Sequence, residues 1–190
     1  GLYPLSRKIP EMIRNLIKEG AKAGNIARMI ALLNDNILER LLSLLEDEMG
    51  KPPVDYCWLL MGSEGRREQT FKTDQDNAIV IDNDPGKLSK KDQAFFLELG
   101  EKLNNDLNTV GYKFCPGEIM AGNPKWNQDL KTWKSYFSGW IQSSQPKDML
   151  DLAIFLDFRG IYGDLGLIQI LRDHVNGFTE GKSIFFHQMA

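Results

Sequence analysis

Two short apolar runs, separated by a highly charged segment, most constrain the fold of this chain. The runs are VDYCWLLM at residues 54–61 and NAIVID at residues 77–82. Pro53 and Gly62 flank the first run, and branched side chains dominate the second, so both favour buried strands over helices. The sequence therefore predicts a small sheet with a charged connection at one of its ends.

Helical patterns precede, separate and follow these two runs. Residues 8–50 and 90–108 place apolar side chains on one face at the spacing of an α-helix. Gly50 and Gly111 then supply the stops at which helices commonly end. From Trp126 onward the pattern turns helical again.

Two further segments extend the predicted sheet. YKFC at 112–115 indicates a third strand, and GEIMA at 117–121 is a candidate fourth. We therefore expect an α/β (α+β) fold, with a small mixed sheet flanked by helices and a helical C-terminal domain. The expected parts are an N-terminal helical segment at 1–50, a core at 51–124 and the C-terminal domain at 125–190.

The composition excludes several classes of protein. A chain of 190 residues with 42% hydrophobic content suits one globular domain, or two small ones that share a core. The net charge of -3 argues against a general nucleic-acid-binding surface, and no apolar run approaches the roughly 20 residues that span a bilayer. Cys57 and Cys115 are too few for a disulfide framework, so we expect two core thiols in a reducing cytoplasm.

The end of the sequence suggests that the chain is a piece of a longer protein. Residues 184–190, IFFHQMA, are still apolar where the sequence stops. Natural domains rarely end on an exposed apolar half-helix. We therefore expect the C-terminal domain to be truncated.

Asp74 and Asp76 place two like charges one residue apart, directly before the second apolar run. Side chains at positions i and i+2 of a strand point to the same face, with α-carbons about 6.5–7 Å apart. Two carboxylates that close repel unless a cation lies between them. Mg²⁺ prefers one or two carboxylates together with substrate phosphates, so the pair predicts a magnesium site suited to phosphoryl transfer.

The segment directly after the first run is suited to phosphate. Gly62 allows the backbone to approach a ligand closely, and Ser63 offers a hydroxyl at the start of a short helix whose amides can cradle phosphate. Arg66 and Arg67 can bring guanidinium groups to phosphate oxygens. Alternatively, one of these arginines pairs with an acidic neighbour on the same short helix.

The longer string GSEGRREQTFKTDQDNA, residues 62–78, resembles the DUF294 family of nucleotidyltransferases. That family belongs to the DNA-polymerase-β-like nucleotidyltransferase superfamily and is related to PII-protein uridylyltransferase. CPGEIMAGNPKW at 115–126 and IFLDFRGIYGD at 154–164 agree with the resemblance. It covers nearly the whole chain, from about residue 8 to the end.

The resemblance implies a reaction and a set of functional residues. A nucleoside monophosphate would move from a nucleoside triphosphate (NTP) to a protein or small-molecule acceptor, releasing pyrophosphate. Asp74 and Asp76 would bind Mg²⁺, while Gly62 and Ser63 would hold the nucleotide phosphates. Relatives of this family commonly act in signal transduction and carry CBS or cyclic-nucleotide-binding regulatory domains on the same chain.

The resemblance leaves a third acidic residue open. Superfamily enzymes usually have one on a later strand, and Glu118 is the best placed by chain order. The family is expected to have glycine at that position, so the alternatives are Glu118 or no third acid. The second alternative motivates two other functions, a non-catalytic nucleotide-sensing module and a protein-interaction module.

Overall fold

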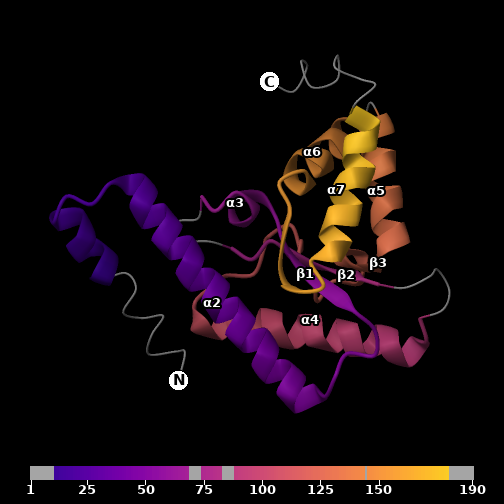
Figure 1. The fold of residues 1–190 in the computed structure, drawn as a ribbon, viewed down its shortest axis with the longest axis horizontal. Coiled ribbons are helices and arrows are strands. Elements are labelled where there is room, and N and C mark those ends of the chain that lie inside the picture. The colour runs from indigo at the N-terminus through magenta and orange to yellow at the C-terminus, as the bar shows by residue number, and fades with distance from the viewer. Residues whose placement is uncertain (1–10, 69–73, 83–87, 144, 180–190) are drawn as a thin grey trace.

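A mixed sheet of four strands forms the centre of the molecule, as the computed structural model shows for residues 11–68, 74–82, 88–143 and 145–179 (Figure 1). The strand order is β3-β2-β1-β4. Strand β1 is antiparallel to both of its neighbours, whereas β2 and β3 are parallel. The strands are β1 (Tyr56–Leu60), β2 (Asn77–Ile81), β3 (Asn127–Asp129) and β4 (Arg159–Gly163). The predicted α/β fold with a small mixed sheet is confirmed.

Helices cover both faces of this sheet (Figure 1). On one face, α2 and α4 pack against alternate residues of β1 and β2, and on the other face α5, α6 and α7 pack against the residues between them. The central strands are therefore buried on both sides, which explains why their sequences are continuously apolar. A first helix spans residues 11–18. The helices after it are α2 (Ala23–Met49), α3 (Gly62–Gly65), α4 (Lys90–Val110), α5 (Leu130–Gln142), α6 (Pro146–Phe155) and α7 (Gly166–Thr179), with a 3₁₀ turn at Pro124–Trp126.

The prediction of strands at 112–115 and 117–121 is wrong. This part of the chain makes only an isolated bridge, between Lys113 and Asp74. Pro116 has no N–H to donate to a ladder, and the chain turns there, with the Glu118 N–H bonded to the Cys115 carbonyl at 3.0 Å. The outer positions of the sheet are filled by β3 and β4 instead.

The segment 125–190, expected to be helical, supplies both outer strands as well as three helices. Strand β4 is rich in glycine, a residue with low strand propensity, so its sequence does not predict a strand. These glycines fit close contacts: a Cβ on Gly160 would lie 2.8 Å from the Cys57 sulfur, and one on Gly163 would lie 2.0 Å from the Tyr56 carbonyl oxygen.

Both cysteines are free and buried, as predicted. Cys57 lies in the core between the sheet and α5–α7. Within the described residues, none of the helices combines the length and apolarity needed to cross a bilayer.

Candidate active site

The candidate site lies where β1 ends and β2 begins. Because these strands are antiparallel, Leu60 pairs with Asn77, and the residues just beyond them meet. The Met61 N–H donates to the Asp76 carbonyl at 3.1 Å, and a Cβ on Gly62 would lie 3.5 Å from Asp76 Oδ2. The Gly62 turn therefore lies directly against the Asp76 side chain.

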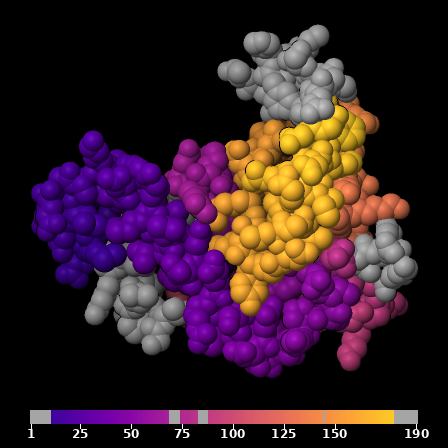
Figure 2. All heavy atoms as spheres, viewed as in Figure 1, coloured from indigo at the N-terminus to yellow at the C-terminus, as the bar shows by residue number. Residues whose placement is uncertain are grey.

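The backbone of this turn has a conformation that favours glycine. Gly62 has a φ of +56° and begins α3, the four-residue helix that also carries Ser63. The first N–H groups of a helix have no partner within it, so they are available to an anion. Figures 1 and 2 show α3 between the N-terminal helices and the C-terminal helices.

The segment that carries Asp74 and Asp76 alternates between two environments. The aspartates are partly exposed, whereas Gln75 and Asn77 are buried on the opposite side. Both buried amides bond to Asn104 of α4: its Nδ2 donates to Gln75 Oε1 at 2.8 Å and to Asn77 Oδ1 at 3.0 Å. This network fixes which face of the segment presents the carboxylates.

The sequence analysis did not assign a role to any of these three amides. The available signal was the period-two alternation of Asp74-Gln75-Asp76-Asn77, in which only the acidic positions were interpreted. Asn104 lies within an amphipathic helix, and nothing local marks it as a partner of β2.

Asp74 and Asp76 form no salt bridge with any residue that the structure describes. The pKa of Asp76 is raised, first by burial and then by the negative charge of Asp74, although a hydrogen bond from the Cys115 thiol opposes the shift. A cation beside both carboxylates would relieve this repulsion.

The donor set suits Mg²⁺ bound together with a phosphate ligand. Carboxylate oxygens are hard donors, and two of them lie next to a turn suited to phosphate. Across the ranges that the structure describes, no group of three or more His, Cys, Asp and Glu residues is arranged to hold a metal. Phosphate oxygens and water would complete the coordination of a metal held by the two aspartates.

Glu118 lies on an exposed turn rather than on a strand. It has a φ of +54°, and its carbonyl accepts a hydrogen bond from Asn123 Nδ2 at 3.1 Å. The same turn begins at Cys115, whose thiol contacts Asp76. Glu118 is therefore attached to a wall of the site, while its role as the third acid stays a prediction.

Comparison with known families bears on this geometry. Residues 7–147 match the family described as Putative nucleotidyltransferase DUF294. The chain belongs to this family. The matched region includes the Gly62 turn, both aspartates and the buried amide network, and it supports a general role in nucleotidyl transfer. A search among curated proteins finds no match to the chain.

In this DUF294 member, Arg66 and Arg67 both have acidic neighbours. Arg66 is exposed and pairs with Glu68 at 2.8 Å and with Asp157 at 2.7 Å. Arg67 has a φ of +58°, and its Nη2 lies 3.8 Å from Asp35 Oδ2. An arginine that binds phosphate here would first have to exchange a carboxylate partner.

A third arginine, Arg159 of β4, holds α3 in place. Its Nε donates to the Glu64 carbonyl at 3.0 Å, and its two terminal nitrogens bond to the Asp35 carboxylate at 2.7 and 3.0 Å. Arg159 and Asp35 are both largely buried, so α2, α3 and β4 meet at one ion pair.

Glu64 is a buried acid that the sequence analysis did not place in the site. Burial, followed by the charge of Asp76, raises its pKa to about 8, while Arg159 acts in the opposite direction. At neutral pH Glu64 therefore holds a proton. Its position on a short polar helix gave no sign that it would be buried.

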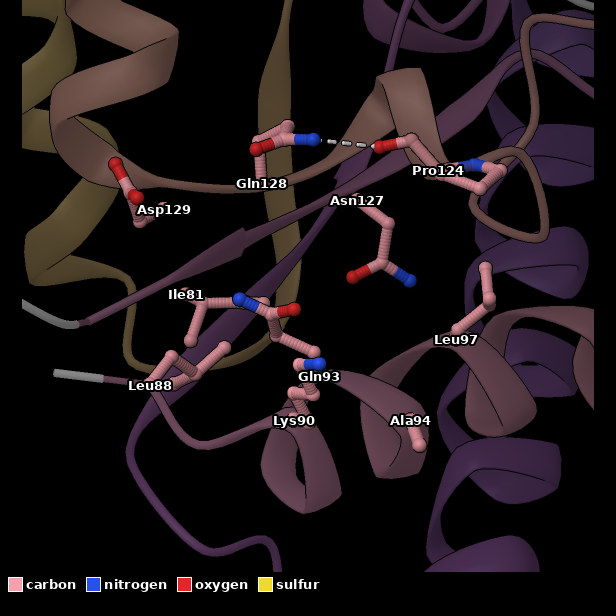
Figure 3. Close-up of a pocket in the computed structure, with 10 residues that line it drawn as sticks. All are labelled: Ile81, Leu88, Lys90, Gln93, Ala94, Leu97, Pro124, Asn127, Gln128 and Asp129. Carbon is pink, nitrogen blue, oxygen red and sulfur yellow. Dashed lines mark hydrogen bonds between the residues drawn. The ribbon is translucent and has the colours of Figure 1, made fainter. Parts of the chain in front are cut away.

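A separate groove lies at the opposite end of β2, between the start of α4 and β3 (Figure 3). Its volume is about 340 Å³, and none of the predicted site residues lines it. Two of its amides are already in use, since Asn127 Nδ2 donates to the carbonyls of Phe96 and Ala121, and Gln128 Nε2 donates to that of Pro124. The groove is thus distinct from the candidate site.

Proposed function

We propose that this chain transfers a nucleoside monophosphate from an NTP to an acceptor, with Mg²⁺ as the cofactor and pyrophosphate as the leaving group. The observation that carries the proposal is the position of Asp76 against the Gly62 turn, with Asp74 two residues away on the same face. Membership of DUF294 supports the general reaction class.

The proposed roles follow from the chemistry of each group. Asp74 and Asp76 would hold Mg²⁺, which neutralises charge on the triphosphate when bound. Ser63 and the first amides of α3 would bind phosphate oxygens. The acceptor oxygen would form its bond to the α-phosphorus as the bond to pyrophosphate breaks, so catalysis would consist mainly of positioning and charge stabilisation.

Glu118 is the proposed acceptor of the proton that leaves the attacking group. Its attachment to the turn that begins at Cys115 supports this role. Glu118→Gln should abolish turnover and spare NTP binding. Unchanged turnover in this variant would remove Glu118 from the mechanism and leave the rest of the proposal standing.

The acceptor and the cellular context are part of the proposal. We propose a protein or small-molecule acceptor, a specificity similar to that of uridylyltransferases, and a place in a larger cytoplasmic signal-transduction protein with CBS or cyclic-nucleotide-binding domains. These statements rest on the kinship of the family with PII uridylyltransferase, which is an argument by analogy.

A screen with NTPs labelled at the α-phosphate tests the proposed reaction. The chain is incubated with Mg²⁺, each labelled NTP and a lysate of the source organism. We expect one NTP to leave its label on an acceptor, with loss of labelling in the Asp76→Asn variant. Labelling that persists in this variant, or no labelling with any NTP, would contradict the proposal.

A second candidate function is nucleotide sensing without catalysis. It is favoured by the position of Glu118, the candidate third acid, on an exposed turn rather than on a strand. A sensing module would bind an NTP and release no pyrophosphate, so a coupled pyrophosphate assay separates the two candidates.

A further inference from the structure

The backbone places Lys113 beside the two aspartates. Lys113 and Asp74 form a parallel bridge, and the Gln75 N–H donates to the Lys113 carbonyl at 2.9 Å. Residues paired in this way project to the same face. Two residues further along each segment, the Cys115 thiol bonds to Asp76, which is the contact that this register requires. Lys113 therefore lies on the face that presents the carboxylates.

The neighbouring cations have carboxylate partners, whereas Lys113 has none among the described residues. Arg66, Arg67 and Arg159 all pair with acidic side chains. Lys113 is exposed, and it forms no salt bridge with any residue in the described part of the chain. Its ammonium group is thus free to meet an anion that arrives at Asp74 and Asp76.

We propose that Lys113 binds the triphosphate of the substrate, opposite the Gly62 turn. This inference rests on the proposed nucleotidyl transfer and adds a substrate-contacting residue to it. A triphosphate brings more negative charge than Mg²⁺ neutralises, so a free lysine on the same face would bind the excess. The extended stretch from Lys113 to Cys115 then forms the wall of the site that faces α3.

The proposal is separable from a role for Lys113 as a counter-ion of the aspartates. Removing a lysine that only repels cations from the site would strengthen metal binding and NTP binding together. Removing a lysine that contacts phosphate would weaken NTP binding and leave the binding of metal alone equal or stronger. NTP binding therefore weakens without a loss of metal binding only if Lys113 contacts the substrate.

The experiment measures both quantities on the full chain. Binding of Mn²⁺ alone is followed by the loss of its paramagnetic resonance signal, and binding of ATP, GTP, CTP and UTP with excess Mg²⁺ by calorimetry. The variants are Lys113→Ala and Lys113→Arg, with Lys131→Ala on the exposed face of α5 as the matched control. We expect Lys113→Ala to weaken NTP binding about tenfold, Lys113→Arg to retain most of it, and Lys131→Ala to change nothing.

Two results would overturn the inference. The first is a Lys113→Ala variant that binds the NTP as tightly as the wild type. The second is a variant that loses affinity for Mn²⁺ alone as much as for the NTP, which would indicate a disturbed site. A wild-type chain that binds no NTP with Mg²⁺ would instead refute the proposed function itself, so the two failures are distinguishable.

Discussion

Glu64 is a carboxyl group that its surroundings keep protonated near neutral pH. Its side chain is only 3% exposed, and the nearby charges of Asp76 and Asp74 disfavour ionisation. Arg159 favours ionisation, but its effect is smaller than that of burial and that of the charge of Asp76. The pKa of Glu64 rises in consequence from its usual 4.5 to about 8.

This shift makes stability depend on pH in a defined direction. The folded chain keeps a proton that the unfolded chain releases above about pH 4.5, so the free energy of unfolding falls as the pH rises from there to about 8. Glu64→Gln removes this contribution. We expect the variant to exceed the wild type in stability by at least about 1 kcal/mol near pH 8, and to match it near pH 4.

Urea unfolding at the two pH values measures the difference. Glu39→Gln, at an exposed position of α2, is the matched control and should follow the wild type at both. A Glu64→Gln variant with the same pH dependence as the wild type would show that Glu64 is not buried as a neutral acid.

Gly65 provides a second test at a single position. A Cβ there would lie 1.7 Å from the Asp157 backbone oxygen, so α3 can pack against the chain before β4 only if residue 65 is glycine. We expect Gly65→Ala to lower the free energy of unfolding by more than about 2 kcal/mol. Gly139→Ala in α5, where an added Cβ meets nothing within 4 Å, should be neutral or stabilising by about 0.5–1 kcal/mol. Equal unfolding midpoints for the two variants would contradict this packing.

Some of these residues could be predicted from the sequence, and others could not. The convergence of Asp74 and Asp76 depends only on the geometry of one strand segment, so local spacing was sufficient. The burial of Glu64 depends on contacts with β4, more than 90 residues later in the chain. Nothing near Glu64 in the sequence carries that information.

At the scale of the elements, α4 holds the Asp74 segment of the site in place through Asn104. Asn104 donates to Gln75 and Asn77, and its own Oδ1 accepts from the Gly122 N–H at 2.8 Å. One side chain thus bonds to Gln75, to Asn77 of β2 and to the Gly122 N–H. Buried polar groups without partners are costly, so this network holds the register of the Asp74 segment.

Asn104→Leu tests whether α4 sets the position of the carboxylates. We expect a loss of about 2–4 kcal/mol in the free energy of unfolding, because Gln75 Oε1 and the Gly122 N–H each lose a partner, and Asn77 Oδ1 keeps only the Ala121 N–H. Mn²⁺ binding to the folded variant should also weaken, since the network no longer fixes which face of the segment presents Asp74 and Asp76. Asn108→Leu, at an exposed position of α4, should leave both measurements unchanged. A stable Asn104→Leu variant with normal Mn²⁺ binding would contradict the role given to the network.

The strands differ in how well the sequence predicts them. Strands β1 and β2 are buried on both faces and therefore appear as apolar runs. Strand β3 has three polar residues, and β4 consists of two glycines among three larger residues, so neither has a strand pattern. Residues 112–115 do have such a pattern, but Pro116 and the turn that follows it prevent a regular ladder.

In the part of the molecule that the structure describes, a hydrophobic layer covers each face of the sheet. The family match ends at residue 147, yet β4 and α7 lie beyond that point and complete the sheet and one layer. The structural unit is therefore longer than the matched region.

A chain that ends at residue 147 tests this conclusion. Without β4, strand β1 loses one of its two partners, and the layer beneath α5 loses the buried residues Leu167, Leu171 and Val175. We expect this fragment to show no cooperative unfolding in urea and little near-ultraviolet circular dichroism from its tryptophans. A chain that ends at residue 179 keeps every described residue and should unfold like the full chain. Cooperative unfolding of the shorter fragment at the same midpoint would contradict the conclusion.

The central claim is that Asp74 and Asp76 bind an NTP through Mg²⁺ beside the Gly62 turn. Calorimetric titration of ATP, GTP, CTP and UTP, with and without Mg²⁺, tests it most directly. Asp74→Asn and Asp76→Asn are compared with Asp82→Asn, an exposed control at the far end of β2. The predicted result is that at least one NTP binds only with Mg²⁺, and that the first two substitutions weaken this binding tenfold or more (about 1.4 kcal/mol) while the third does not. Binding that needs no Mg²⁺, or that survives both substitutions, would contradict the claim.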